Sequence, residues 1–273
     1  MKVRPRQVFK LLLYFLGIYL FTLFTFYLFH DRLIFRRTQL PLTHTFQFTL
    51  PYEEYFITTP DQTRLNALYF KTEQESKGLI FYLHGNADNL SRWGSYAVDF
   101  TSKGYDVFML DYRGYGKSEG KPTESLLYQD AAFTLNWVFT NLPHTRLIIY
   151  GRSLGSAVAS QLAGKVEPEL LILETPFAEI KDVVYWLLRP AFYLFPMDIH
   201  FSNTQSLPKV HCRKAIFHGT RDWIVPLASA ESLTTSLGPA DHFIVIEGGG
   251  HRNLRDFPLY HEKLAEILPQ DPD

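Results

Sequence analysis

The feature that most constrains the fold is a series of short, continuous apolar runs between residues 78 and 247. They cover residues 78–84, 106–112, 146–150, 170–174, 214–218 and 242–247. A strand that is buried on both faces is apolar throughout, because neither set of its alternating side chains meets water. Helical patterns separate most of these runs, and the clearest lie at residues 91–102, 122–141 and 257–268. This alternation predicts an α/β fold with a doubly wound, mostly parallel sheet and helices on both faces.

Two more strands are expected before the first of these runs. The segments YFITT and LNALYF flank the turn-rich sequence PDQT, which predicts an antiparallel hairpin over residues 55–70. The sheet should therefore contain about eight strands. The chain has 273 residues, of which 46% are apolar, so one α/β domain with a large core is expected.

The first thirty residues form a separate segment. The run LLLYFLGIYLFTLFTFYLF, residues 11–29, has nineteen residues and no charge, close to the ~20 that cross a membrane as a helix. A buried core helix and a cleaved signal peptide are the alternatives. The apolar core of a signal peptide usually has about 7–15 residues and ends at a small-residue cleavage site. No such site occurs in the following HDRLIFRR, so we expect an uncleaved transmembrane anchor over residues 1–30.

Basic residues lie on both sides of this run. Four precede it and three follow it, namely Lys2, Arg4, Arg6 and Lys10, then Arg32, Arg36 and Arg37. Because cytoplasmic flanks are enriched in Lys and Arg, the N-terminus is expected in the cytoplasm. The chain is thus predicted to cross the membrane once, with residues 31–273 as a folded domain on the non-cytoplasmic side.

The net charge and the cysteine content argue against a nucleic-acid-binding surface, an internal disulfide and a cysteine-rich metal site. The formal net charge of −1 argues against a broad electrostatic surface for nucleic acid. The single cysteine, Cys212, allows no internal disulfide and no cysteine-rich metal site. No H-E-x-x-H or similar cluster indicates a metal, so neither a metal nor a cofactor is expected. The sequence does not indicate an oligomeric state.

One short motif joins a predicted strand directly to a predicted helix. The sequence GRSLG, residues 151–155, has the pattern G-x-S-x-G at this junction. The glycines let strand and helix approach closely, and the sharp turn lifts the serine Oγ above the carboxyl edge of the sheet. The helix N-terminus supplies free N–H groups suited to a developing oxyanion. Ser153 is therefore the candidate nucleophile.

A serine hydroxyl needs a base and an acid to act as a nucleophile. AIFHGTRDWIVP places Asp222 after the penultimate strand, and FIVIEGGGHRNL places His251 after the last strand. Both loops lie at the sheet edge that carries Ser153, so these three residues form the predicted triad. Glu174, which also follows a strand, is the alternative acid.

Other residues at this edge have less support. His84 and His218 each end a strand beside a glycine and could approach the site, but both are more simply hydrogen-bonded structural residues. The sequence YLHGNADNL turns sharply where the run at 78–84 ends, so the N–H of Asn86, or that of Ala87, is expected to pair with the N–H of Leu154 as an oxyanion hole.

Five sequences, in this order along the chain, resemble those of the α/β-hydrolase superfamily. They are HGNAD (84–88), DYRGYGKSEGKPTE (111–124), GRSLG (151–155), HGTRDWIVP (218–226) and GGGH (248–251). More narrowly, they are similar to the branch with an N-terminal signal anchor that includes the bud-emergence-type proteins. The resemblance covers about residues 30–268. It implies the α/β-hydrolase fold and a Ser153–Asp222–His251 triad.

The predicted triad indicates a serine hydrolase that acts through an acyl-enzyme and without a cofactor. The resemblance does not fix the substrate, because members of this branch act on different esters, thioesters or peptides. We expect this chain to cleave carboxylic esters or thioesters. A site tethered close to the bilayer favours a lipophilic acyl substrate, and no basic cluster near the motifs indicates a strongly anionic one. Deletion of residues 1–30 is expected to leave a soluble, active domain. The alternatives are a serine peptidase or aminopeptidase of the same fold, and a membrane-anchored binding protein that retains the fold without catalysis.

Two segments near the site have alternative roles. Arg113 or Tyr115 could contact substrate, although the simpler interpretation is that Arg113 braces its own loop through backbone carbonyls. The segment VVYWLLRPAFYLFPMDIHF, residues 183–201, is predicted to form a helix that packs on the sheet. Its alternative roles are an apolar wall for an acyl chain and a surface that rests on the membrane.

Overall fold

A computed structural model describes residues 5–270, and this part of the chain contains a mixed sheet of eight strands. Their spatial order is β10 (His242–Ile246), β9 (Arg213–Gly219), β8 (Leu170–Glu174), β7 (Leu147–Arg152), β4 (Leu79–Leu83), β6 (Asp106–Leu110), β3 (Arg64–Phe70) and β2 (Glu53–Thr58). The predicted hairpin of β2 and β3 is antiparallel, as is the pair β3 and β6. The other five neighbouring pairs are parallel. The predicted α/β fold with a mostly parallel sheet is confirmed.

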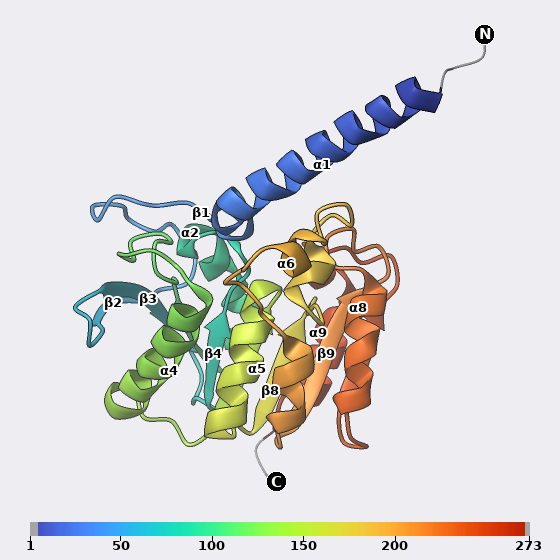
Figure 1. Cartoon of the computed structure of the whole chain (residues 1–273). Coiled ribbons are helices and arrows are strands. Elements are labelled where there is room, and N and C mark those ends of the chain that lie inside the picture. Colours follow the sequence, from blue (N-terminus) through green and yellow to red (C-terminus); the bar gives the residue numbers. More distant parts are fainter. Residues whose placement is uncertain (1–4, 271–273) are drawn as a thin grey trace.

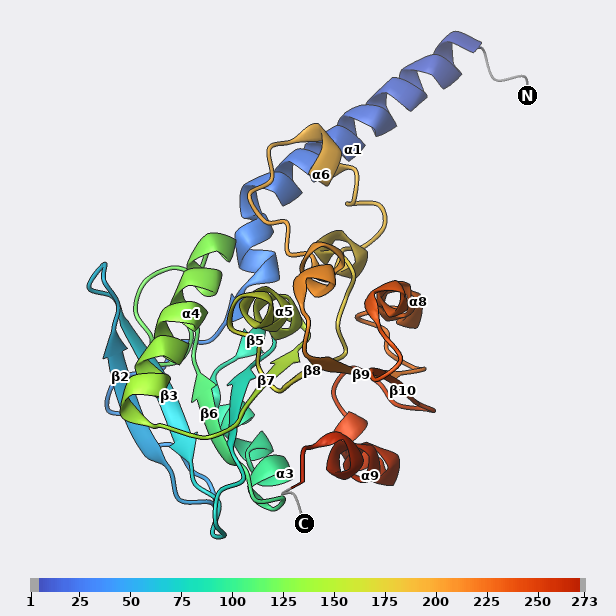
Figure 2. The ribbon, with the colours of Figure 1, turned by 90° about the horizontal axis from the view of Figure 1, so that it is seen from below.

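Helices cover both faces of the sheet, as Figure 2 shows. One face carries α4 (Glu124–Asn141), α5 (Leu154–Val166) and α8 (Leu227–Glu231), and the other carries α3 (Val98–Thr101) and α9 (Pro258–Ile267). Shorter elements lie in the connections: α2 (Leu90–Trp93), α6 (Ala191–Leu194), α7 (Asn203–Ser206), and the 3₁₀ turns η1 (Gly94–Tyr96), η2 (Ile180–Val183), η3 (Leu207–Lys209), η4 (Ser232–Ser236) and η5 (Leu254–Asp256). A two-residue parallel ladder, β1 (Arg36–Arg37) with β5 (Ala87–Asp88), was not predicted from the sequence.

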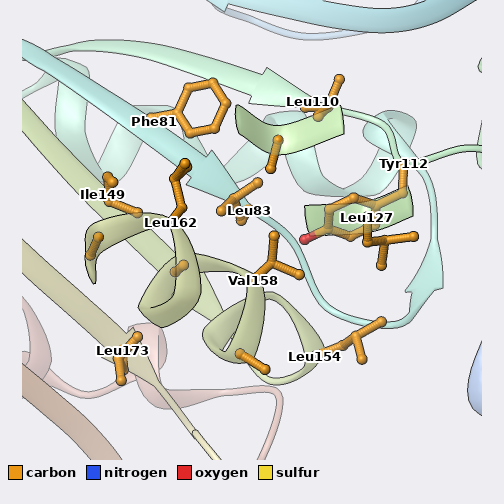
Figure 3. Packing of buried hydrophobic residues seen from close by; sticks show 14 of the residues in the cluster. Phe81, Leu83, Leu110, Tyr112, Leu127, Ile149, Leu154, Val158, Leu162 and Leu173 are labelled. Atoms are coloured by element: carbon orange, nitrogen blue, oxygen red, sulfur yellow. The ribbon is translucent and has the colours of Figure 1, made fainter. Parts of the chain in front are cut away.

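The central strands are buried on both faces, which explains their continuous apolar sequences. In β4, Phe81 and Leu83 belong to the core beneath α4 and α5, whereas Ile80 and Tyr82 belong to the core beneath α3 and α9. Figure 3 shows the first of these cores, where Leu154 packs into the same cluster as Leu83. The first residue of α5 is thereby held against the end of β4.

Backbone and side chains pack very closely where α5 crosses the ends of β4 and β7. A Cβ atom added at Gly155 would lie 2.1 Å from the carbonyl oxygen of Leu83. One added at Gly151 would lie 2.4 Å from the Cβ atom of Ala159. Since real Cβ contacts are much longer, only glycine fits at these two positions. The sequence-based explanation of the two glycines is therefore supported by the packing.

The long N-terminal helix α1 (Pro5–Ile34) projects from the α/β body, as Figure 1 shows. Most of its apolar side chains are exposed, among them Phe9, Phe15 and Phe21. Within residues 5–270 it is the one helix that is long and apolar enough to cross a membrane. These exposed side chains would require an apolar surrounding, because a patch of this size is rare on a soluble monomer.

The C-terminal half of α1 packs against the protein. Leu23 and Phe26 are buried in a cluster with Val184, Ala191 and Met197. The Tyr19 hydroxyl also donates a hydrogen bond to the backbone carbonyl of residue 187, at 2.9 Å. The expected boundary between anchor and folded domain at residue 30 therefore lies inside a packed region.

The prediction of a single helix over residues 183–201 is wrong. Only the four residues of α6 are α-helical there, and Tyr185, Trp186 and Tyr193 are exposed rather than packed on the sheet. Pro190 is the N-cap of α6, and the helix ends at Leu194, with Phe195 as its C-cap directly before Pro196. Proline lacks an N–H, so a continuous helix is interrupted at such positions. The segment instead contacts α1, as Figure 2 shows for α6.

The packing around α5 makes one prediction about stability. Gly155→Ala should lower the free energy of unfolding by about 3 kcal/mol, because its methyl group meets backbone atoms that have no room to move. Gly164→Ala in the same helix is the matched control, since its Cβ would meet Lys209 at 3.4 Å. That variant should be neutral or up to about 1 kcal/mol more stable. Denaturant unfolding followed by circular dichroism measures both, and equal stability of the two variants would contradict the packing argument.

Candidate active site

Ser153 occupies a strained turn between β7 and α5. Its φ is 52° and its ψ is −116°, a backbone conformation that L-residues rarely adopt and that concentrates at functional sites. The N–H of Ser153 donates to the carbonyl of Glu174 at 2.9 Å, and its carbonyl accepts from the N–H of Ser156 at 2.9 Å. The strained conformation is therefore held from both sides, and the side chain is left at the end of the sheet.

The structure brings Ser153, His251 and Asp222 together. His251 Nε2 lies 3.0 Å from Ser153 Oγ, and His251 Nδ1 lies 2.8 Å from Asp222 Oδ2. An ionised carboxylate only accepts hydrogen bonds, so Nδ1 carries the proton and Nε2 is free to accept the serine proton. This is the arrangement of a nucleophile, a base and an acid that orients the base.

Asp222 is buried, yet it is held in its ionised form. Its Oδ1 accepts hydrogen bonds from the N–H groups of Ile224 and Val225, both at 2.8 Å. Burial acts to raise the pKa of Asp222, but the hydrogen bond from His251 and those from the two N–H groups outweigh it. The pKa of this carboxyl therefore lies below its ordinary value.

The alternative acid, Glu174, is bonded to residues other than His251. Its carboxylate accepts a hydrogen bond from the hydroxyl of Tyr150 and lies 3.4 Å from the guanidinium of Arg152. Arg152 in turn donates to the backbone carbonyl of His251 at 3.0 Å. Glu174 thus holds a buried arginine, and that arginine holds the loop of His251. Sequence reasoning missed this role of Arg152, the second residue of GRSLG.

The two alternative bases are fully buried and bonded locally. His84 contacts its neighbouring carbonyl at Gly85 (2.7 Å) and the carboxylate of Asp111 (3.2 Å). His218 contacts the carbonyl of Gly219 at 3.1 Å and lies 3.7 Å behind Asp222. Burial lowers the pKa of His218, which favours a neutral ring. The contacts of both histidines are those of hydrogen-bonded structural residues, as the simpler interpretation of the sequence predicts.

The loop that carries Asn86 lies beside Ser153. Asn86, Ser153 and Leu154 line one cavity, and Leu154 is the first residue of α5, so its N–H has no acceptor four residues back. The carbonyl of Asn86 accepts a hydrogen bond from Tyr115 at 2.9 Å, and its side chain donates to the carbonyl of Ile34 at 2.9 Å. The loop is thereby tied to the end of α1. That the two N–H groups form an oxyanion hole remains a prediction.

Arg113 braces its loop, but through carboxylates rather than through carbonyls. Its guanidinium donates to Asp130 and to Asp61, each at 2.6 Å. Tyr115 is buried and supports Asn86 rather than facing the cavity that Ser153 lines. Arg113 therefore braces its loop, as the simpler sequence-based interpretation has it, but its partners are carboxylates and not the expected backbone carbonyls.

An apolar cavity of about 290 Å³ extends from Ser153 toward α1. Its walls come from three places, and its apolar lining includes Phe26, Leu33 and Ile34 of α1, Phe177 and Ile180 after β8, and Val183, Val184, Tyr185 and Leu188 of the following segment. We call it the acyl cavity. An apolar wall for an acyl chain was an alternative role of residues 183–201 in the sequence analysis, but the contribution of α1 to this wall was not predicted.

The expectation that no basic cluster lies near the motifs is wrong. A second cavity adjoins Ser153 and His251, and four arginines line it: Arg36, Arg92, Arg152 and Arg252. These residues are far apart in the sequence, so no local pattern could reveal that they meet. Among residues 5–270, no group of three or more His, Cys, Asp or Glu side chains could hold a metal ion.

The chain is similar to known hydrolases. A family model described as serine aminopeptidase, S33, matches residues 74–198. The lysophosphatidylserine lipase ABHD12 of Danio rerio is 35% identical over 188 residues, which cover 60% of this chain and 48% of that protein. This chain therefore spans about half the length of that relative. An uncharacterised protein of Mycobacterium tuberculosis is 31% identical over 202 residues, covering 72% of this chain and 71% of that protein.

More distant relatives share the architecture. The human α/β hydrolase domain-containing protein 17B is 28% identical over 222 residues, covering 80% of this chain and 76% of that protein. The crystal structure of the Pyrococcus furiosus esterase PF2001 has a TM-score of 0.67 at 20% identity, and covers 84% of this chain and 97% of that one. At this identity the structural likeness shows the fold alone.

The geometry of the three residues predicts how an active-site-directed fluorophosphonate will react. It should label Ser153 with one adduct per chain, and Ser153→Ala should abolish labelling. Asp222→Asn and His251→Ala should slow labelling on the order of 10³-fold, by the precedent of other triads. Glu174→Gln is the matched carboxylate control and should slow it far less. Mass spectrometry locates the adduct, and the labelling rates compare the variants. If Glu174→Gln slows labelling severely while Asp222→Asn slows it only slightly, Glu174 is the acid.

Proposed function

The chain belongs to the α/β-hydrolase superfamily of serine hydrolases, and from this premise we propose that it hydrolyses carboxylic esters or thioesters with lipophilic acyl groups. One observation carries the proposal: a hydrogen-bonded line from Asp222 through His251 to Ser153 opens on the acyl cavity. The line supplies an activated nucleophile, and the cavity supplies an apolar place for the acyl chain.

The proposed reaction has two steps. His251 Nε2 takes the proton of Ser153 as Oγ forms a bond to the carbonyl carbon, and the N–H groups of Leu154 and Asn86 stabilise the oxyanion. The bond to the leaving alcohol or thiol then breaks, and His251 returns the proton to it. Water next attacks the acyl-enzyme with His251 as base, which releases the acid and restores Ser153. Asp222 holds the imidazole tautomer and stabilises the imidazolium.

The acyl group is proposed to be lipophilic because the walls of the cavity are apolar and the cavity lies at the base of α1. Tyr185, Trp186 and Tyr193 are exposed in the segment beside that helix, and Tyr193 is 74% exposed. Aromatic side chains of this kind are enriched at membrane–water interfaces. The name of the Danio rerio relative, a lysophosphatidylserine lipase, supports a lipid ester as substrate.

We also propose that α1 is an uncleaved membrane anchor and that the catalytic domain lies on the non-cytoplasmic side. The helix spans roughly 45 Å at 1.5 Å per residue, which exceeds the ~30 Å of a hydrocarbon core. The contacts of α1 with the protein begin at Tyr19, and the part of α1 before Tyr19 would span only about 21 Å. The proposed membrane span therefore includes residues of α1 that also contact the protein. A mature protein whose N-terminus lies near residue 30 would contradict this proposal.

A serine peptidase is the second candidate, because the matching family model is described as a serine aminopeptidase. The apolar lining of the acyl cavity favours an acyl chain over a peptide. A non-catalytic binding protein is the third candidate, and the intact line of hydrogen bonds argues against it.

The size of the acyl cavity predicts how activity depends on chain length. For the full chain in nonionic detergent, kcat/KM should rise from p-nitrophenyl acetate through butyrate to octanoate, by up to roughly fourfold per buried CH₂. It should stop rising between octanoate and palmitate, once the cavity is full. Activity confined to acetate, or a preference for an aminoacyl-nitroanilide, would contradict the proposal.

A variant of α1 sharpens this test. Leu33→Trp should lower kcat/KM for octanoate far more than for acetate, because the larger side chain fills the cavity. Leu13→Trp is the matched control, since Leu13 is an exposed leucine of the same helix that does not line the cavity. If both variants keep the wild-type chain-length profile, α1 is not a wall of the acyl site.

A further inference from the structure

The proposed reaction gives no role to the cavity that four arginines line. It has a volume of about 80 Å³, and Arg36, Arg92, Arg152 and Arg252 line it together with Ser153 and His251. No Asp or Glu side chain is among its lining residues in the described part of the chain. We call it the arginine compartment.

The arginines reach this compartment from separate parts of the fold. Arg36 belongs to β1 and pairs in register with Ala87, which directly follows Asn86. Arg92 lies in α2, and Arg252 directly follows the candidate base. With Arg152 at the end of β7, four segments of the chain thus place cations around one small space.

Two of the four guanidinium groups already have anionic partners. Arg152 is 1% exposed and lies 3.4 Å from Glu174. Arg92 pairs with Asp88 at 2.7 Å. Within residues 5–270, by contrast, Arg36 and Arg252 make no side-chain hydrogen bond and no ion pair. Arg36 and Arg252 are both exposed to solvent, so they are the two lining arginines whose charged groups are available to pair with a ligand.

Arg252 directly follows His251, and Arg36 lines the same cavity as His251, so their positive charges act on the base to the extent that water does not screen them. In the proposed reaction His251 becomes an imidazolium, and neighbouring positive charges raise the energy of that state. An anionic group in the compartment would offset this repulsion. Arginine suits such a group because its planar guanidinium donates two parallel hydrogen bonds to a phosphate or carboxylate.

The two cavities place this anion on the alcohol portion of the ester. Both are lined by Ser153, Asn86, Arg36 and Ile224, so Ser153 lies where they meet. When the acyl chain enters the apolar cavity from the reacting carbonyl, the leaving group faces the other side. We propose that the arginine compartment binds an anionic group, above all a phosphate within a few bonds of the scissile ester, on the leaving alcohol of the substrate. This inference rests on the proposed esterase function.

Membrane headgroups could be a second source of the same phosphate chemistry. A further cavity at the end of α1 is lined by one acidic residue, Asp31, and by four basic ones, Arg32, Arg36, Arg37 and Lys121. Its excess of positive charge would attract an anionic bilayer surface. A test must therefore exclude an effect of bulk surface charge. A short-chain, monomeric substrate in nonionic detergent does so, because no anionic surface is then present.

The experiment compares two octanoyl esters that differ in the phosphate. The full chain in nonionic detergent is assayed with 1-octanoyl-lysophosphatidylglycerol and with 1-octanoylglycerol, and the ratio of their kcat/KM values is the readout. Arg252→Gln and Arg36→Gln should each lower this ratio by roughly tenfold, the size expected for a hydrogen bond to a charged group. Arg252→Lys should restore part of the loss, since it keeps the charge without the planar fork.

Lys165→Gln is the matched control. Lys165 is an exposed residue near the C-terminal end of α5, the opposite end from Ser153, so the same loss of charge should leave the ratio unchanged. Fluorophosphonate labelling of Ser153 reports whether each variant retains an intact site. If both Arg→Gln variants keep the wild-type ratio of kcat/KM values, the arginine compartment does not bind the phosphate, and the proposed esterase function is unaffected. If Ser153-dependent hydrolysis of both esters is absent, the proposed function itself fails, and this inference fails with it.

Discussion

The close approach of α5 to the ends of β4 and β7 determines how the rest of the site is built. Because Gly151 and Gly155 have no side chains, the helix begins directly against the strands, and Ser153 must take a positive φ to join them. That turn carries the serine to the edge where the parallel strands end. The loops after β9 and β10 leave the same edge, so Asp222 and His251 meet the serine without any unusual path of the chain.

The site also depends on a segment outside the α/β body. The end of α1 supplies a wall of the acyl cavity, and the carbonyl of Ile34 accepts a hydrogen bond from the side chain of Asn86. The proposed anchor is thus joined to the proposed oxyanion loop within one packed unit. A lipid whose acyl chain lies along α1 would have its ester near Ser153, which gives the membrane helix a part in substrate binding as well as in tethering.

Local patterns predicted the strands and the candidate triad because both follow from local chemistry. Residues buried on two faces are continuously apolar, and residues after parallel strands share one edge. The arginine compartment could not be predicted, because Arg36, Arg92 and Arg252 meet only after the chain has folded. The 183–201 segment does not form the predicted helix for a different reason. Its central apolar residues, such as Ala191 and Met197, pack on α1, whereas Phe201 at its end joins the core of the sheet. The prolines at 190 and 196 also interrupt a helix.

The central claim is that Ser153 attacks an acyl group whose chain lies between α1 and the segment after β8. An alkyl fluorophosphonate that carries a diazirine at the end of its chain tests both parts at once. After the probe has reacted with the full chain, illumination and peptide mass spectrometry locate the crosslink. We predict modification of Ser153 and crosslinks within residues 26–34 or 183–188, which line the acyl cavity. An unmodified Ser153, or crosslinks only to residues outside this cavity, would contradict the account.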